Sequence, residues 1–225
     1  MPVGFRILKR QRKVSADVVE RFTRLPVANV SDSMSRLTAG GALLRPMHGG
    51  AGMAGPALTV KTAPGDNLML HKAIALAEPG DIIVVDAGGD LTNALMGEMM
   101  LMQTVKRRVG GVVINGAIRD AAYIRGQKLP VFAAGVTHRG PYKNGPGEIN
   151  VPIAIGGMVI EPGDLIIGDD DGILCVPFDH VEAVYKGATA KFDAEQKQMA
   201  NIQAGTHDAS WVDKQLRDAK CEGLD

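Results

Sequence analysis

The sequence predicts an α/β fold built from βαβ units, and three observations support this prediction. Helix and strand patterns alternate regularly over residues 56–134. Strands within this part, such as 82–86 and 111–115, are continuous apolar runs, which is typical of parallel strands buried on both faces. Over 151–177 short strands follow one another without helices, which predicts a barrel-like, β-rich second half.

Residues 1–50 are expected to form a helical N-terminal part. Apolar spacing predicts helices over 15–24 and 30–37. Ser31 or Asp32 is available as the N-cap of the second helix.

An α/β core is expected over 54–177. Its first predicted elements are a strand over 56–62, a helix over 68–77, a strand over 82–86, a helix over 97–108, a strand over 111–115, a short helix from 121 and a strand over 130–134. The Gly- and Pro-rich residues 135–150 are expected to be a loop with a functional or interface role. The remaining predictions are strands near 151–155, 157–160, 164–168 and 173–177, and a C-terminal part, 179–225, that opens with a helix to about 202.

Composition favours a single soluble domain that acts on small molecules or proteins. The 225 residues are 45% hydrophobic, which is enough for one sizeable core. Lys plus Arg and Asp plus Glu number 25 each, so the net charge does not favour a nucleic-acid partner. Apolar runs stop short of the roughly 20 residues that cross a bilayer, and no secretory segment opens the chain, so we expect a cytoplasmic protein without a membrane association. Cys175 and Cys221 are expected to be free thiols.

Several motifs are better explained by structure than by ligand binding. The run Glu78–Asp86 recurs as Glu161–Asp169, and Pro followed by Gly predicts a type II turn before each strand. Residues 50–55 match G-x-G-x-x-G, but a strand follows rather than a helix, which argues against a nucleotide site. Residues 169–172 are expected to form a hairpin turn, since a calcium loop needs a closing Glu. The histidines, His71 included, show no metal-ligand spacing.

The most informative segment is 110–120, where an apolar strand ends at Arg119 and Asp120. Ligands of open α/β sheets gather at the carboxyl ends of strands, where Arg119 could bind an anionic or carbonyl oxygen and Asp120 a hard divalent cation. Gly97 and Glu98 open the preceding helix, whose free N–H groups could bind a carboxylate. The alternative is structural: Asp120 caps the next helix, and Glu98 is an ordinary acidic first-turn residue.

A resemblance to a known family weighs on this choice. The stretch from about Ala54 to Pro177 carries GPALTVKT, GDN, EPGDIIVVDAGG, GEMM, GGVVINGAIRD, LPVFAAG and NVPIAIGGMVIEPGDLIIGDDDGILCVP, and it resembles the RraA-like family. That family contains divalent-metal aldolases of the 4-hydroxy-4-methyl-2-oxoglutarate or 4-carboxy-4-hydroxy-2-oxoadipate type and regulators of ribonuclease E activity. The resemblance implies one RraA-like domain over 1–225, a fold similar to swivelling phosphohistidine domains, and a homotrimer or homohexamer with sites between subunits.

The resemblance also assigns roles to residues. The amides of Gly97, Glu98, Met99 and Met100 would hold the carboxylate of pyruvate, Arg119 would contact substrate oxygens, Asp120 would ligate Mg²⁺ or Mn²⁺, and Glu98 would hold a metal-bound water. Glu195 is the candidate for a Glu that reaches the metal waters of a neighbouring subunit. Tyr123 stands where the family often has an acidic residue, which bears on metal affinity or substrate preference.

The resulting hypothesis is a class II pyruvate aldolase that also decarboxylates oxaloacetate, with a 2-oxoacid as substrate. Both reactions leave a pyruvate enolate, which a hard cation and Arg119 would stabilise. Side chains expected to influence substrate choice are Tyr123, His138, Arg139 and Tyr142. The main alternative is a non-catalytic, protein-binding regulator of the ribonuclease E type. An adenosyl-dependent methyltransferase is a weaker one.

Overall fold

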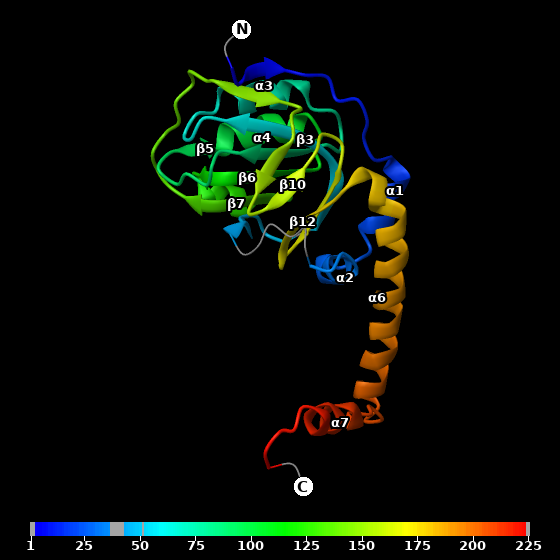
Figure 1. The fold of residues 1–225 in the computed structure, drawn as a ribbon. Coiled ribbons are helices and arrows are strands. Elements are labelled where there is room, and N and C mark those ends of the chain that lie inside the picture. Colours follow the sequence, from blue (N-terminus) through cyan, green and yellow to red (C-terminus); the bar gives the residue numbers. More distant parts are fainter. Residues whose placement is uncertain (1–2, 37–42, 51, 224–225) are drawn as a thin grey trace.

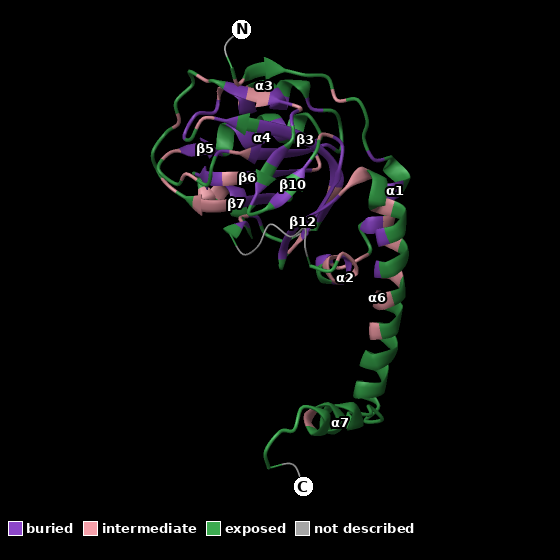
Figure 2. Cartoon of the chain, viewed as in Figure 1, coloured by how far each residue is buried: buried purple, intermediate pink, exposed green. Residues whose placement is uncertain are grey.

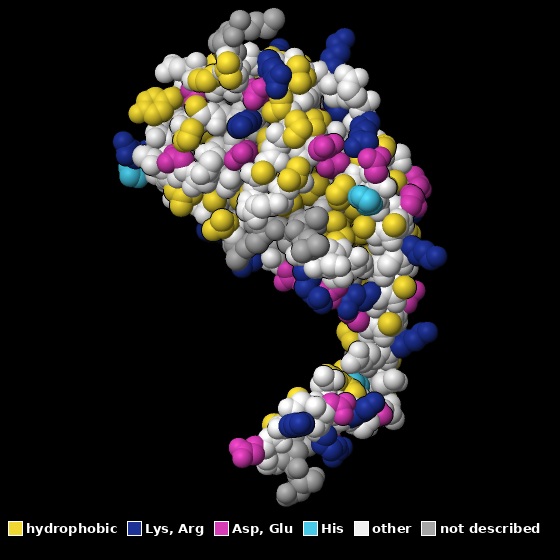
Figure 3. Space-filling model, viewed as in Figure 1, with side chains coloured by type: hydrophobic (Ala, Val, Ile, Leu, Met, Phe, Trp, Pro, Cys, Tyr) yellow, Lys and Arg dark blue, Asp and Glu magenta, His cyan; other side chains and the backbone are white. Residues whose placement is uncertain are grey.

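The computed structural model describes residues 3–36, 43–50 and 52–223. It is a mixed α/β core from which one long helix, α6 (Val181–Gln203), projects and ends at a short helix, α7 (Ser210–Asp218) (Figure 1). Acidic and basic side chains are interspersed over the face of the molecule drawn in Figure 3. In the described part of the chain, no helix has the length and apolar character to cross a membrane.

The first half of the core is the predicted set of parallel strands. These are β3 (Met53–Thr62), β4 (Ile82–Asp86), β6 (Gly111–Ile118) and β7 (Val131–Val136), which pair in that order. Their connections contain α3 (Leu68–Leu76), α4 (Glu98–Lys106) and α5 (Ala121–Arg125). The prediction of βαβ units is therefore confirmed, because β3, β4 and β6 are buried over most of their length, which allows helices to cover the sheet.

Short strands extend this sheet where the sequence did not predict them. They are β1 (Phe5–Ile7), β2 (Arg45–Pro46), β5 (Ala94–Met96) and β8 (Gly147–Ile149). The expectation of a loop over 135–150 was therefore wrong at its end, because β8 pairs with both β1 and β3. Segments of two or three residues are too short to show a strand period, so tertiary pairing decides them.

The second half of the core closes against the first. It consists of β9 (Ile153–Ile155), β10 (Met158–Ile160), β11 (Leu165–Asp169) and β12 (Gly172–Val176). β11 pairs with β12 and with the beginning of β3, so β3 joins the two halves. Val84 and Phe132 from the parallel half pack in one buried cluster with Ile153 and Ile166 from the second half, which makes the centre barrel-like.

The N-terminal helices pack on the outside of the β11–β12 hairpin. They are α1 (Ala16–Phe22) and α2 (Val27–Ser33), and they share a buried cluster with α6. The predicted start of the second helix was wrong: Asp169 Oδ2 accepts a hydrogen bond from Val27 N (2.9 Å), so α2 begins earlier and contains Ser31 and Asp32. Its predicted end at Leu37 lies outside the described residues.

The C-terminal arm has little contact with the core. In α6 only Val184 and Ala188 are buried, and no residue of α7 is. Figure 2 shows most of the C-terminal half of α6 and nearly all of α7 as exposed. The predicted helix from 179 to about 202 is confirmed, preceded by one 3₁₀ turn.

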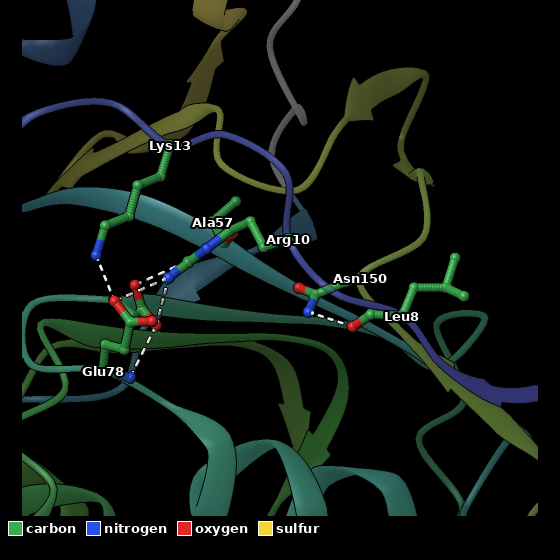
Figure 4. A network of polar contacts seen from close by, with 7 residues as sticks. Leu8, Arg10, Lys13, Ala57, Glu78 and Asn150 are labelled. Carbon is green, nitrogen blue, oxygen red and sulfur yellow. Dashed lines mark hydrogen bonds and ion pairs between the residues drawn. The ribbon is translucent and has the colours of Figure 1, made fainter.

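The two repeated turns are structural and anchor the N-terminal segment. Asp81 Oδ2 accepts from Glu78 N (2.9 Å), and Asp164 Oδ2 accepts from Glu161 N (2.8 Å). Figure 4 shows Arg10 reaching this first turn, where its guanidinium donates to both carboxylate oxygens of Asp81 (2.8 and 3.2 Å).

Candidate active site

The structure brings together the two segments that the sequence singled out. β5 lies beside β6, and Arg119 N donates to Met96 O at 2.9 Å. α4 begins directly after β5, and Glu98 N donates to Asp120 Oδ2, also at 2.9 Å. The end of β6 and the beginning of α4 therefore form one rigid corner.

Asp120 stabilises α4 rather than the helix that follows it. It lies at the N-terminal boundary of α5, but its side chain makes no capping hydrogen bond there. Its backbone is left-handed (φ 56°), a conformation that Asp tolerates better than most residues, and such positions are concentrated at functional sites. The structural alternative of Asp120 as the cap of the next helix is therefore not what the structure has.

Gly97 allows this close approach. A Cβ atom at this position would lie 2.4 Å from Asp120 Oδ2 and 2.9 Å from Arg119 Cγ. The backbone angles of Gly97 are extended and open to any residue, so the demand is for space. The corner thus depends on the absence of a side chain at residue 97.

The N-terminus of α4 offers amides to an anion. The first hydrogen bond within the helix runs from Leu101 N to Gly97 O. The amides of Glu98, Met99 and Met100 come before it, so they have no carbonyl partner within the helix. The Glu98 amide is taken by Asp120. The Met99 and Met100 amides, together with the positive end of the helix dipole, suit a carboxylate.

A pocket of about 260 Å³ opens over this corner. It is lined by Asn67, His71, Ala94, Leu95, Met96, Gly97, Met99, Met100, Gln103, Arg119, Pro141 and Lys143. Met99 is 75% exposed, whereas Met100 is buried. The pocket is large enough for a small oxoacid and carries two cations, Arg119 and Lys143.

Sequence reasoning missed four polar residues of this pocket, of which Gln103 lies on α4. Asn67 directly precedes α3, His71 lies within α3, and Lys143 lies in the Gly- and Pro-rich loop. Their signal was weak: an Asn before a helix suggests a cap, although Asn67 makes no capping bond. Burial lowers the pKa of His71, and the nearby Lys143 charge lowers it further.

The four residues expected to influence substrate choice do not line this pocket. Tyr123 is partly buried and packs against the hydrophobic cluster that contains Leu101 and Ile124. An aromatic ring therefore stands where the family often has an acidic side chain. Tyr142 acts through its backbone, since its carbonyl accepts from Asn67 N (3.0 Å). His138 and Arg139 also lie outside the lining.

Asp120 and its surroundings fit a magnesium-like ion held mostly by water. The Asp120 side chain is 41% exposed, and only its Oδ2 is used in the hydrogen bond to Glu98 N. The exposed Glu98 carboxylate follows Gly97 directly. Among the described residues no group of three His, Cys, Asp or Glu side chains could enclose a metal. Mg²⁺ commonly binds through one or two carboxylates and keeps several waters, so a single protein ligand suits it.

Glu195 lies on α6, outside this pocket. Its carboxylate accepts from Asn29 Nδ2 (2.6 Å) and pairs with Lys191 (3.2 Å), and these two contacts lower its pKa. Within one chain it therefore belongs to a polar contact between α2 and α6. Its predicted role at a neighbouring subunit stays a prediction.

Comparison with known proteins identifies the family. Residues 27–175 match the family described as RraA-like (Aldolase/RraA). The chain belongs to this family. It is 40% identical over 175 residues, 78% of this chain and 83% of the relative, to a Halalkalibacterium halodurans protein named "Putative 4-hydroxy-4-methyl-2-oxoglutarate aldolase". A Burkholderia multivorans protein with the same name is 40% identical over 131 residues, 58% of this chain and 79% of the relative.

A solved structure of this family shares the fold. Streptomyces coelicolor RraAS2, described as an unusual member of the RNase ES inhibitor RraA protein family, superposes with a TM-score of 0.75 at 26% identity. The match covers 85% of this chain and 98% of RraAS2. The RraA-like family thus contains relatives named for catalysis and relatives named for inhibition.

Proposed function

We propose that this RraA-like protein is a divalent-metal-dependent aldolase that cleaves 4-hydroxy-4-methyl-2-oxoglutarate or a similar substrate to pyruvate, and that it decarboxylates oxaloacetate. The relatives' aldolase names support the substrate class. The observation that carries the proposal is the hydrogen bond from Glu98 N to Asp120 Oδ2, which fixes an anion-binding helix start beside a carboxylate and a guanidinium.

The chemistry follows from the substrate. In the aldol cleavage the C3–C4 bond breaks, its electron pair forms the enolate of pyruvate, and the C4 hydroxyl loses its proton as C4 becomes a ketone. The enolate then takes a proton at C3, so two molecules of pyruvate result. In oxaloacetate the same bond breaks, carbon dioxide leaves, and the same enolate forms.

The corner would supply binding and charge. The Met99 and Met100 amides bind the carboxylate next to the ketone, and Arg119 faces the ketone oxygen, which becomes negative. Asp120 would hold Mg²⁺ or Mn²⁺, which when bound acts as a Lewis acid on that oxygen. A water held by Glu98, or by Glu195 of a neighbouring subunit, would take the hydroxyl proton and return one to the enolate.

The contribution of Glu195 requires an oligomer, a trimer or hexamer on our proposal. Mixing an Arg119→Ala variant with a Glu195→Gln variant tests it, because mixed assemblies would contain intact sites made from one good subunit of each kind. Recovery of turnover on mixing supports a shared site. Absence of recovery, with exchange of subunits demonstrated by mass, rejects it.

The metal proposal is tested by steady-state pyruvate release with Mg²⁺, with Mn²⁺ and with chelator. Asp120→Asn is the sharpest variant, because Asn also tolerates the left-handed backbone and keeps an acceptor for Glu98 N. We expect turnover that needs the metal and a fall of about 10²-fold or more in Asp120→Asn. Turnover unchanged by chelator and by this variant would reject the metal mechanism.

A regulator of the ribonuclease E type is the second candidate, because the fold of RraAS2 covers most of this chain. This alternative expects saturable binding to a ribonuclease and slower RNA cleavage. A pull-down coupled to an RNA-cleavage assay decides: binding without any pyruvate release would replace the aldolase proposal.

A further inference from the structure

One buried polar atom in the pocket lacks a partner. Asn67 is 2% exposed, and its Nδ2 donates to Leu95 O (2.9 Å). A carbonyl only accepts, so this bond fixes which way the amide points. Asn67 Oδ1 is left buried with no hydrogen-bond donor among the described residues. Such an acceptor calls for an O–H or N–H donor from whatever fills the pocket.

A cation lines the same pocket as this acceptor. Lys143 lines the same pocket, and its charge acts on His71, one helical turn after Asn67. The main chain around Lys143 is held firmly, because the buried Asp66 Oδ2 accepts from Asn144 N (2.6 Å) and Gly145 N (2.9 Å). Tyr142 O on the other side accepts from Asn67 N (3.0 Å).

Arg119 lines the same pocket directly after the end of β6. Its Nη1 is the nearest atom to a Cβ built at Gly140, and its Cγ and Nε lie against Gly97. The pocket therefore contains two separate cationic groups: Arg119 with the corner of α4, and Lys143 with Asn67 and the start of α3. A monoacid such as pyruvate would use the first group and leave the second unused.

We propose that Lys143 and Asn67 recognise the second half of the substrate, a 4-hydroxy dicarboxylate. Lys143 Nζ pairs with the distal carboxylate, and Asn67 Oδ1 accepts a hydrogen bond from the C4 hydroxyl. A donor-only ammonium and an acceptor-only amide oxygen in one pocket match the carboxylate and the hydroxyl of one substrate. The hydroxyl proton is shared between Asn67 Oδ1 and the water that removes it, so the contact with Asn67 persists as the proton leaves. This inference rests on the proposed aldolase function.

The test for Lys143 compares two substrates that differ only at the distal group. These are 4-hydroxy-4-methyl-2-oxoglutarate and 4-hydroxy-4-methyl-2-oxopentanoate, in which a methyl replaces the distal carboxylate. For the dicarboxylate, Lys143→Met should raise KM roughly 10- to 100-fold with kcat unchanged, because the distal group binds equally in ground and transition states. For the methyl analogue, Lys143→Met should leave KM unchanged. For the dicarboxylate, Lys143→Arg should bring KM most of the way back to the wild-type value.

A second readout separates this inference from the proposed function. Exchange of the pyruvate methyl protons with deuterated water, followed by NMR, requires enolate formation but no distal carboxylate. Lys143→Met should lose less in this exchange than it loses in kcat/KM for the dicarboxylate, whereas the control Lys106→Met, at the C-terminal end of α4, should match wild type in both. If wild type neither exchanges nor cleaves, the aldolase proposal itself fails. If wild type is active and Lys143→Met affects both substrates alike, or neither, only the Lys143 inference is overturned.

Asn67 is tested with oxaloacetate as the reference, because oxaloacetate has no C4 hydroxyl. Asn67→Leu should lower kcat/KM for the hydroxy substrate about 10-fold more than kcat/KM for oxaloacetate decarboxylation. The ratio is insensitive to partial misfolding, since the same molecules catalyse both reactions. An equal fall for the two substrates would overturn the assignment of the hydroxyl to Asn67.

Discussion

Two pairs of Arg and Asp in this chain have the same chemistry and opposite surroundings. Arg10 and Asp81 form a two-pronged pair with side chains 9% and 1% exposed. Arg119 and Asp120 are 44% and 41% exposed, and their nearest charged atoms are 3.8 Å apart. The first pair neutralises itself, whereas the second leaves both groups largely free to contact a ligand.

The difference teaches how to separate a structural pair from a functional one. The oxygens of Asp81 accept from Arg10 and from Glu78 N, and the side chain is buried, so Asp81 is not accessible to a ligand. Asp120 uses one oxygen for Glu98 N and holds a strained backbone beside a pocket. Satisfied, buried charges stabilise a fold, whereas partly satisfied, accessible ones are available for chemistry.

The largest effect on stability is expected at the buried pair. Arg10→Met leaves Asp81 buried without its cation and should lower the free energy of unfolding by about 3–5 kcal/mol. Urea unfolding measures this, and kcat well below the unfolding midpoint should stay at the wild-type value. The double variant Arg10→Met/Asp81→Asn should lose less than Arg10→Met alone; an equal or larger loss would contradict this account of the pair.

The reverse pattern is expected at the exposed pair. Arg119→Ala should lower kcat for pyruvate release by about 10²–10³-fold, because the developing enolate charge loses its cation. Its free energy of unfolding should change by less than about 0.5 kcal/mol, since the side chain is largely exposed. A variant that is strongly destabilised yet active would place Arg119 with the structural pair instead.

An intermediate effect is expected at Gly97. Gly97→Ala forces a Cβ against Asp120 Oδ2 and should move the carboxylate off Glu98 N. We expect a loss of about 10²-fold in kcat/KM, as for a shift of about 1 Å in a catalytic group. Gly126→Ala is the matched control, because its Cβ would meet nothing closer than 3.5 Å. Equal activity in the two variants would contradict the close-packed corner.

The smallest effect is expected in the titration of His71. Its pKa lies below the ordinary 6.5 in the folded chain, so the unfolded state binds the proton first as the pH falls. The contribution of His71 to stability is present above pH 6.5 and is lost as the pH drops through the folded pKa. Lys143→Met should raise the NMR titration midpoint of His71, because one of the two causes of its shift is removed. An unmoved midpoint would show that Lys143 lies too far from His71 to act on it.

Local sequence determined most of the fold and the two halves of the corner. Apolar runs such as Ile82–Asp86 predicted parallel strands, and the EPGD repeats predicted two turns. The sequence also predicted that Arg119 and Asp120 lie at the end of a strand and that Gly97 lies at the start of a helix, as they do. These features depend on hydrophobic periodicity and on turn-forming residues. Both are local patterns of a few residues, so they can be recognised from the sequence alone.

Tertiary structure alone decided which of these features meet. The hydrogen bond from Glu98 N to Asp120 Oδ2 joins residues far apart in sequence, and it exists because β5 pairs with β6. Asn67 and Lys143 line the same pocket because Asp66 holds the loop that carries Lys143 against the start of α3. Strand pairing and the burial of unsatisfied polar atoms are long-range effects, so no local pattern records them.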